Sequence, residues 1–242
     1  NVDIIYGNGT SSRHAITGTN QNWLELRDYV KSHDLSDPEV YQAVVDWVDI
    51  DNYMDMVINE IYVGNQDTGN IKCYRERVDG AKWRWFYYDV DWGFFYTDSA
   101  NVNTNNLLKY LNDTGHGAGQ GFETWLIMGL LENEEFRTQF IERFAYHINV
   151  TYDPTRVIER INEIYEVLDP EMEQDRTHWN EEFENSPSWY KELASRWMSY
   201  NSWSSTQKDR LIAFANGRPQ VMESQLQAYF DIDDEWMAEL FP

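Results

Sequence analysis

Oxygen-bearing side chains gather in two short segments of this sequence, residues 64–70 (GNQDTGN) and residues 89–93 (DVDWG). Five of these side chains are candidate ligands: Asn65, Asp67, Asn70, Asp89 and Asp91. Carboxylate and amide oxygens are the ligands that hard divalent cations prefer, and a cation held in this way can in turn hold the phosphates of a nucleotide. The two segments therefore predict a metal and nucleotide site, provided that the fold brings them together.

A β-hairpin is expected between these two segments. Residues 71–77 and 82–90 are rich in strand-forming side chains, and the Asp-Gly pair at residues 79–80 between them is a strong hairpin signal. An antiparallel hairpin returns the chain to the place where it began. Asp67 and Asn70, at its start, should therefore lie beside the acids at its end.

The second strand of this hairpin should carry both acids on one face. Alternate residues of a strand point the same way, which groups the side chains of Trp83, Trp85, Tyr87, Asp89 and Asp91. Burial beside tryptophan is costly for a carboxylate unless a cation or hydrogen-bond donors compensate it. This placement supports metal binding, but the simpler interpretation, a solvated strand end in a very acidic chain, stays open.

Simpler interpretations also exist for the neighbouring polar residues. Asn, Asp and Gly are ordinary turn formers, so residues 64–70 could be a plain loop. Five of the nineteen basic side chains lie between Lys72 and Arg84, where several could face a phosphate or an acidic substrate. Charge pairing across an exposed sheet face is the preferred interpretation of these five.

Other kinds of site and partner find no support in the sequence. The five histidines show no metal-ligand spacing, no nucleophile motif occurs, and the single cysteine, Cys73, excludes an intrachain disulfide. Forty-two acidic against nineteen basic residues give a formal charge of −23, which repels nucleic acid phosphates and anionic membrane surfaces. No apolar run approaches the eighteen residues of a spanning helix, so neither nucleic acid binding nor membrane insertion is expected.

The fold expected for these 242 residues is one domain of the α+β class, predominantly helical, with one small antiparallel sheet. A short strand is expected at residues 2–6 and a loop at residues 7–20. Ser36 should cap a helix that begins with Pro38, residues 49–52, which start with Asp49, can cap the next helix, and residues 217–219 should separate two helices. Helices are expected at about residues 23–30, 38–48, 53–62, 107–111, 123–131, 134–148, 154–179, 188–200, 205–216 and 219–230, with a glycine-rich loop at 115–121.

The residues around the hairpin resemble the CotH family, the spore-coat-type atypical protein kinases of bacteria and some fungi. The most specific match is Gly64-Asn65-Gln66-Asp67 combined with Asp91-Trp92-Gly93 after the hairpin. The other matching stretches run through most of the chain: Asp51-Asn52-Tyr53, Asn59, Gly69-Asn70-Ile71-Lys72, 80–85, 88–94, 131–133, 135–137, Phe140, Arg143-Phe144 and Arg218-Pro219.

This resemblance implies a kinase-like C-terminal lobe that binds ATP with magnesium, or with manganese, and phosphorylates serine or threonine of a protein. On this analogy Asp67 is the catalytic carboxylate that orients or deprotonates the hydroxyl. The implied cofactor-binding residues are Asn65, Asn70 and Trp92. The implied metal ligands are Asn70, Asp89 and Asp91. Because the family segment commonly carries two acids, the analogy leaves open which of Asp89 and Asp91 has the principal metal-binding role.

The family pattern also includes an N-terminal β-rich lobe with a basic residue that clamps the phosphates. These 242 residues contain neither a glycine-rich strand-turn-strand nor a strand like Val-Ala-Ile-Lys, so the expectation is a C-terminal lobe with little or no kinase activity by itself. The expected partner is a coat or surface protein, at the spore coat or the extracellular surface of a bacterium. Two alternatives stay open: a non-catalytic assembly protein of the coat or surface, and a metal-dependent Asp-x-Asp glycosyltransferase, which would normally need a βαβ unit.

Overall fold

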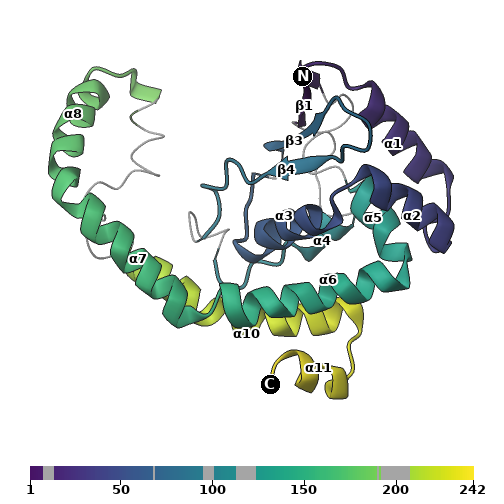
Figure 1. The fold of residues 1–242 in the computed structure, drawn as a ribbon. Helices are drawn as coiled ribbons and strands as arrows, with labels where there is room; N and C mark the ends of the chain where they lie inside the picture. Colours follow the sequence, from purple (N-terminus) through teal and green to yellow (C-terminus); the bar gives the residue numbers. More distant parts are fainter. Residues whose placement is uncertain (8–13, 68, 95–100, 113–123, 190, 192–207) are drawn as a thin grey trace.

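The structure is a computed structural model that describes residues 1–7, 14–67, 69–94, 101–112, 124–189, 191 and 208–242. Figure 1 shows a small β-sheet near the N-terminus, a body of helices beside it, and an arm of two helices that extends away from the body. The arm consists of α7 (Pro154–Leu168) and α8 (Met172–Glu184). This arrangement confirms the α+β class and the predominance of helices. Within the described part of the chain, no helix is both long enough and apolar enough to cross a membrane.

Four antiparallel strands form the sheet, in the order β2-β1-β3-β4. The strand β1 (Val2–Gly7) pairs along its whole length with β3 (Ile71–Glu76), and β4 (Arg84–Phe86) pairs with the other edge of β3. The predicted hairpin of β3 and β4 is thus confirmed. The strand β2 (His14–Thr17) pairs with β1, so the prediction of an unbroken loop there is wrong. Its four residues carry little strand signal of their own, and pairing with β1 decides their conformation.

The body contains α1 (Gln21–Ser32), α2 (Pro38–Trp47), α3 (Ile50–Tyr62), α4 (Leu107–Leu111), α5 (Trp125–Glu132), α6 (Glu134–Tyr146), the π-helix His147–Thr151, α10 (Lys208–Phe230) and α11 (Asp234–Leu240). The helix α3 is central, since eight of its thirteen residues are buried and it contacts β4, α4 and α6. It leads directly into residues 64–70. The first candidate segment therefore begins at the end of a helix that is buried in the core.

Tryptophan rings fix the hairpin to the body. Trp23 of α1 meets Trp83 and Trp85 edge-on, at ring-centroid distances of 5.2 and 5.9 Å. It also meets Trp125 of α5 at 5.3 Å. Edge-to-face contacts of this kind add to the free energy gained by burying the rings. The hairpin is therefore held at a fixed distance from α1 and α5.

The cap of α2 differs from the prediction. The side chain of Asp37 accepts the backbone N–H of Glu39 at 2.8 Å, whereas the hydroxyl of Ser36 donates to Asp34. Because Pro38 is the first helical residue, the N-cap falls on the residue directly before it. The signal for a helix start was correct, and only the capping residue was misplaced.

The helix α10 continues through Pro219, so the boundary predicted at residues 217–219 is wrong. Proline lacks a backbone N–H and usually ends a helix. Here Phe214 and Met222, on either side of the proline, are both completely buried in the core, as is Arg218. Tertiary packing on both sides of Pro219 outweighs the local signal.

The remaining predicted helices agree with the structure apart from their ends. The helix expected at residues 154–179 is divided by a 3-10 turn at Asp169–Glu171, and α6 continues into a π-helix rather than ending near residue 148. The helix α11 was not predicted. The glycine-rich loop at 115–121, most of the helix expected at 188–200 and the start of the one expected at 205 lie outside the described residues.

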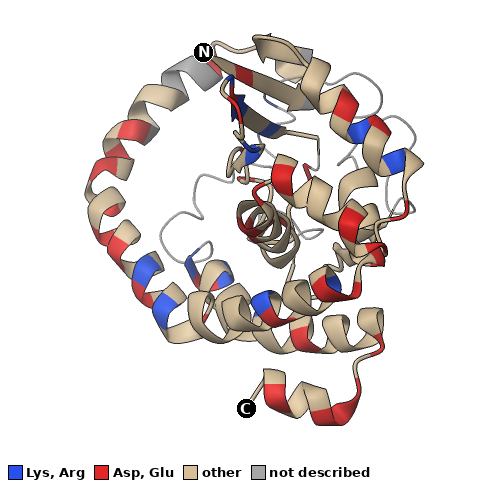
Figure 2. Ribbon diagram, turned by 45° about the vertical axis from the view of Figure 1, so that its right-hand side comes forward, with Lys and Arg blue, Asp and Glu red and all other residues tan. Residues whose placement is uncertain are grey.

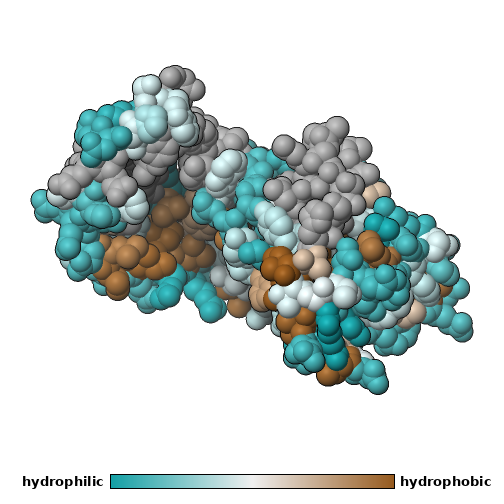
Figure 3. Space-filling view, turned by 90° about the horizontal axis from the view of Figure 1, so that it is seen from above, coloured by the Kyte–Doolittle hydropathy of each residue, from teal (hydrophilic) through white to brown (hydrophobic). Residues whose placement is uncertain are grey.

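The arm is anchored to the body along one side of α7. Ile161 and Tyr165 of α7 form a small apolar cluster with Ala215 of α10. On another side of α7, Val167 is 71% exposed. Figure 3 shows the resulting hydrophobic surface on the arm, in brown.

Candidate functional site

The loop at residues 64–70 begins where α3 ends. Gly64 has a φ of +69°, which lets the chain leave the helix, and the backbone N–H of Asn65 donates to the carbonyl of Glu60 at 3.2 Å. The side chain of Asn65 is buried, and its Oδ1 accepts the backbone N–H of Asp67 at 3.0 Å. This Asx turn places Asp67 at the edge of the core with its carboxylate partly exposed.

Asn70 joins the two candidate segments. Its Nδ2 donates to Oδ2 of Asp67 and to Oδ2 of Asp89, at 2.7 Å in each case. Its Oδ1 accepts a hydrogen bond from the hydroxyl of Tyr6 in β1. The structure thus brings Asp67, Asn70 and Asp89 together, as hairpin closure predicts. Tyr6 was not predicted as part of this cluster.

Asp89 reaches this position by a different path from the predicted one. The strand β4 ends at Phe86, and Asp89 has a φ of +60°, so the two-residue alternation does not extend to the acids. Trp83 and Trp85 are buried, whereas Asp89 and Asp91 are exposed. The predicted common face is therefore wrong, because a left-handed residue turns the chain and breaks the strand period. The argument that burial beside tryptophan requires a compensating cation no longer applies.

Electrostatics distinguishes Asp67 from the other acids. Partial burial raises the pKa of Asp67, the backbone hydrogen bond from Gly69 lowers it, and the negative charges of Asp89 and Asp91 raise it again. The net effect is a pKa above the ordinary value. Asp91 thus acts on the site through its charge. A carboxylate with a raised pKa is a better proton acceptor than one stabilised by a salt bridge.

Backbone hydrogen bonds fasten residues 92–94 to the end of α3. The N–H of Gln66 donates to the carbonyl of Trp92 at 3.3 Å, and the N–H of Phe94 donates to the carbonyl of Val63 at 2.7 Å. Gly93 lies so close to Val63 that an added Cβ would come within 2.8 Å of a Val63 methyl carbon. Glycine is therefore required where the two segments meet. The side chain of Trp92 is 45% exposed next to the acids.

The basic side chains of the sheet differ in their contacts. Arg77, directly after β3, pairs with Asp3 of β1 at 2.7 Å, in keeping with the preferred interpretation of charge pairing between neighbouring strands. Lys72 instead lies over the ring of Tyr88, with Nζ 3.6 Å from the centroid, and near the ring of Tyr6. Figure 2 shows basic positions on the sheet strands and acidic positions along the helices. Two tyrosines thus place Lys72 close to the acid cluster.

A buried arginine that was not predicted supports the loop from beneath. The guanidinium of Arg218 is completely buried and donates four hydrogen bonds of 2.6 to 2.9 Å to backbone carbonyls. The acceptors are Ile61, Tyr62, Val102 and Thr104. Arg218 therefore satisfies the last carbonyls of α3, just before the loop. Burial lowers its pKa to about 10, which leaves it charged at neutral pH.

Two residues of α4 also contact the loop and its supporting helix. Nζ of Lys109 donates to Oε1 of Gln66 at 2.6 Å, and burial lowers the pKa of Lys109. The hydroxyl of Tyr110 donates to Oε2 of Glu60 at 3.0 Å. Glu60 lies three residues after Val57 in the apolar face of α3. A carboxylate within the apolar face of a helix predicts a buried polar contact, so this signal could have identified Glu60 from the sequence.

The donor chemistry suits a hard divalent cation, but the side chains are not arranged as a formed metal centre. Among the residues that the structure describes, no group of three or more His, Cys, Asp and Glu side chains could hold a metal ion. Asn70 presents its NH₂ group, rather than its oxygen, to Asp67 and Asp89. A half-turn of its terminal amide would bring the oxygen to this side and would break the bond from Tyr6. Asp67 and Asp89 thus fit as oxygen ligands directly, and Asn70 fits only after rotation.

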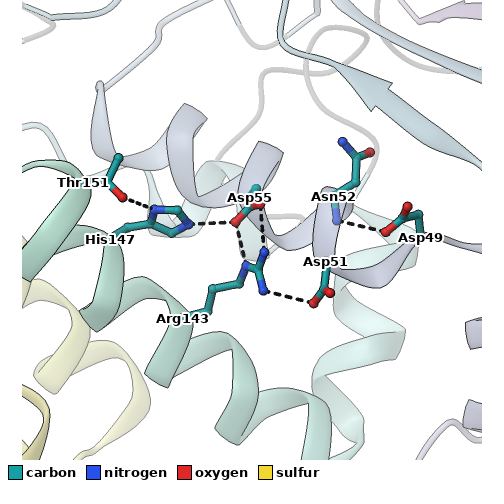
Figure 4. Close-up of polar contacts among 7 residues, drawn as sticks. All are labelled: Asp49, Asp51, Asn52, Asp55, Arg143, His147 and Thr151. Carbon is teal, nitrogen blue, oxygen red and sulfur yellow. Dashed lines mark hydrogen bonds and ion pairs between the residues drawn. The ribbon is translucent and has the colours of Figure 1, made fainter.

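A second polar cluster lies in the first half of α3 (Figure 4). Arg143 of α6 donates to both oxygens of Asp55, from Nε at 2.6 Å and from Nη2 at 2.8 Å, and Nη1 donates to Asp51 at 3.0 Å. Nε2 of His147 lies 2.7 Å from Oδ1 of Asp55, while Nδ1 lies 2.8 Å from the hydroxyl of Thr151. Burial alone would raise the pKa of Asp55, but the hydrogen bonds and charges of Arg143 and His147 hold it well below its usual range.

Neighbouring residues show that this part of α3 is a scaffold. The side chain of Asn52 accepts the backbone N–H of Trp85 at 2.6 Å and donates to the Trp85 carbonyl at 3.3 Å, which ties α3 to β4. Asp49 caps α3 by accepting the backbone N–H of Asn52 at 3.2 Å, as predicted. The part of α3 that begins at Asp51 therefore links this helix to the sheet and to α6.

The fold and the cluster define a class of protein: a predominantly helical α+β domain that presents carboxylates and amides at the open end of a β-hairpin. A family model described as CotH kinase protein matches residues 7–222, which is most of the chain. The chain therefore belongs to the CotH kinase family, as the resemblance predicted, and is a kinase-related protein of a family associated with the spore coat. Searches of curated proteins and of solved structures found no match.

Proposed function

We propose that this chain provides the carboxylate-bearing part of a kinase site, which transfers the γ-phosphate of ATP to serine or threonine of a coat or surface protein. It would act together with the β-rich lobe that such kinases require. The observation that carries the proposal is the Asn70 amide, which bridges Asp67 and Asp89 at 2.7 Å each. Membership of the CotH kinase family supports it.

In this proposal Asp67 receives the hydroxyl of the protein substrate. It accepts a hydrogen bond from the hydroxyl and takes its proton as the hydroxyl oxygen bonds to the γ-phosphorus and the bond to the β–γ bridging oxygen breaks, releasing ADP. The raised pKa of Asp67 favours this transfer. Asp89, Asp91 and a rotated Asn70 would hold magnesium or manganese, which would supply charge neutralisation at the phosphate oxygens. Asn65 would hold the Asp67 loop beside the nucleotide, and Trp92 would contact the nucleotide.

Isothermal titration of the full-length natural protein with ATP and magnesium tests this proposal. The expected result is ATP binding that depends on the metal. Asp89→Ala or Asp91→Ala should weaken this binding at least tenfold, because each removes a negatively charged carboxylate that would hold the cation at the phosphates. Asp51→Ala is the matched control, since it removes an acid of the scaffold cluster instead. Absence of nucleotide binding in the wild-type protein would refute the proposal and favour a non-catalytic assembly protein.

The other alternative and the cellular location can be addressed separately. A glycosyltransferase with an Asp-x-Asp motif would normally place it after a βαβ unit, and the four described strands are all antiparallel. Location at the spore coat or the outer cell surface is part of the proposal. Fluorescence microscopy of a tagged protein during sporulation would test it.

A further inference from the structure

Glu60 is a buried carboxylate directly behind the candidate site. It is 3% exposed, and its Oε2 accepts hydrogen bonds from Nδ2 of Asn65 at 2.7 Å and from the hydroxyl of Tyr110 at 3.0 Å. Asn65 and Tyr110 are themselves buried. Because burying a carboxylate is costly, its two donors have to compensate for the lost water. The contact between Glu60 and Asn65 is therefore one of the stronger polar links in this part of the core.

The same asparagine holds the loop on its other side. Oδ1 of Asn65 accepts the backbone N–H of Asp67 at 3.0 Å, while Nδ2 faces Glu60. An amide has one donor end and one acceptor end, so the carboxylate of Glu60 decides which way the amide points. In the reversed orientation, the NH₂ group would face the N–H of Asp67, and both hydrogen bonds would be lost. Glu60 thus determines the orientation of the group that fixes Asp67.

We infer that Glu60 is a positioning residue for Asp67 and acts through the side-chain amide of Asn65. It does not touch the substrate or the nucleotide. Its effect on catalysis rests on the proposed function, whereas its effect on the loop does not. The two can therefore be tested apart, the second without nucleotide or metal.

The charge state of Glu60 should modulate this link near neutral pH. Burial raises the pKa of Glu60 to about 7, hydrogen bonds from Asn65 and Tyr110 oppose the rise, and the negative charge of Asp67 adds to it. Among the residues that the structure describes, the other titratable groups that interact with Glu60 are Tyr87, Tyr110 and Tyr152, which are neutral at this pH. The protonated carboxyl is a weaker acceptor than the carboxylate, so the Asn65 amide should be held less firmly below pH 7.

Hydrogen exchange of the Asp67 backbone amide, followed by NMR in the whole chain without nucleotide, measures the link directly. Glu60→Leu removes the acceptor for Asn65 and should speed exchange about tenfold, the equivalent of one hydrogen bond. Glu60→Gln keeps an oxygen that can accept from Asn65, and exchange should stay within about twofold of wild type. Tyr110→Phe is the matched control, because it removes the other bond to Glu60 and leaves the Asn65 contact in place.

Unchanged exchange at Asp67 in a folded Glu60→Leu protein would overturn the inference. Should that variant not fold, the side-chain NH₂ resonances of Asn65 provide a second measurement in folded proteins. They should differ between the wild type and Glu60→Gln, because the acceptor of the Asn65 NH₂ group changes from a carboxylate to an amide oxygen. Identical Asn65 NH₂ resonances in the two proteins would equally overturn the inference.

The catalytic consequence has its own readout. In the active protein, Glu60→Leu should lower kcat with little change in KM, and Glu60→Gln should restore most of kcat while removing the inflection near pH 7 from the pH profile. If ATP does not bind at all, the proposed function fails, but the exchange result still decides the role of Glu60. If ATP binds and Asp67 exchange does not respond, only the inference about Glu60 fails.

Discussion

Two carboxylate clusters, one in the first half of α3 and one just beyond its C-terminal end, are built in opposite ways. In the first half, the guanidinium of Arg143 and the imidazole of His147 contact Asp55, and its pKa lies below the usual range. After the second half, the neutral amide of Asn70 bridges Asp67 and Asp89, and the pKa of Asp67 lies above the ordinary value. Aspartate is thus part of a completed ion pair in one place and keeps an uncompensated charge in the other.

This difference indicates which cluster serves the fold and which can serve a ligand. The charge of Asp55 is compensated within the protein, and the bonds of Arg143 to Asp51 and Asp55 join α3 to α6. Asp67, Asp89 and Asp91 repel one another, which costs stability unless a cation or a proton arrives. Titratable groups with a raised pKa and like-charged neighbours are concentrated at functional sites. The cluster around Arg143, the arginine cluster, therefore stabilises the fold, and the cluster bridged by Asn70, the amide-bridged cluster, is the one that the proposed function uses.

The largest effect is expected for Asp67→Asn in the active protein. Loss of the proton acceptor should reduce the rate of phosphate transfer from ATP by about 10² to 10⁴, measured as the initial rate with radiolabelled ATP. Asp51→Asn in the arginine cluster should leave the rate within about twofold. Equal losses in the two variants would remove the functional distinction between the clusters.

Glu60→Gln should stabilise the protein at alkaline pH. The pKa of Glu60 in the folded chain, about 7, lies above its ordinary value of 4.5, so the folded state binds more protons between these pH values. The free energy of unfolding contributed by Glu60 therefore falls as the pH rises from about 4.5 to about 7. Because Gln does not titrate, the substitution should raise the free energy of unfolding by up to roughly 3 kcal/mol at pH 8 and by little at pH 4. Urea unfolding at both pH values measures this difference. A difference that is the same at both pH values would contradict the assignment.

Gly93→Ala should disturb the amide-bridged cluster and spare the arginine cluster. Its Cβ would meet Val63 at 2.8 Å, and overpacking of this kind costs about 1 to 3 kcal/mol in thermal or denaturant unfolding. Gly217→Ala is the control, because its Cβ would meet Val102 at an ordinary 3.5 Å within α10 and should be neutral or slightly stabilising. Similar unfolding curves for the two variants would show that the approach of residue 93 to Val63 is not tight.

Asp55→Asn should have the smallest effect, and one that depends on acid pH. The pKa of Asp55 is lowered by folding, so its contribution to stability is present above its ordinary value of 3.8 and is lost as the pH falls below it. Since its side chain is 37% exposed, the loss at pH 7 should be only about 1 kcal/mol. Thermal unfolding at pH 7 and pH 3 should show the difference shrinking at pH 3. A constant difference would mean that packing, rather than charge, explains the effect.

Much of the scaffold could be predicted from local sequence signals. Asp-Gly at residues 79–80 predicted the hairpin, and Asp49 predicted the cap of α3, because both signals act over a few residues. Hairpin closure also predicted that Asp67 and Asn70 would meet Asp89. The strand period failed for Asp89 and Asp91, since β4 ends at Phe86 and the left-handed conformation of Asp89 then turns the chain.

The supports of the site could not be predicted in the same way. Arg218 reaches the end of α3 from a helix more than 150 residues away, and Tyr6 approaches from the first strand. Such contacts depend on how distant elements pack together, and local periodicity carries no information about that packing. The continuity of α10 through Pro219 has the same origin, because packing on both sides of the proline decided it.

The hydrogen bond from Tyr6 to Asn70 links positions 64 residues apart and crosses from β1 to the end of the loop. A helix such as α3 can form from contacts between near neighbours, but this bond requires one edge of β1 to remain unpaired until β3 has been made. During synthesis the ribosome must therefore add a further 64 residues after Tyr6 before this bond can form. Until then, the edge of β1 that later pairs with β3 is open and could pair with another chain.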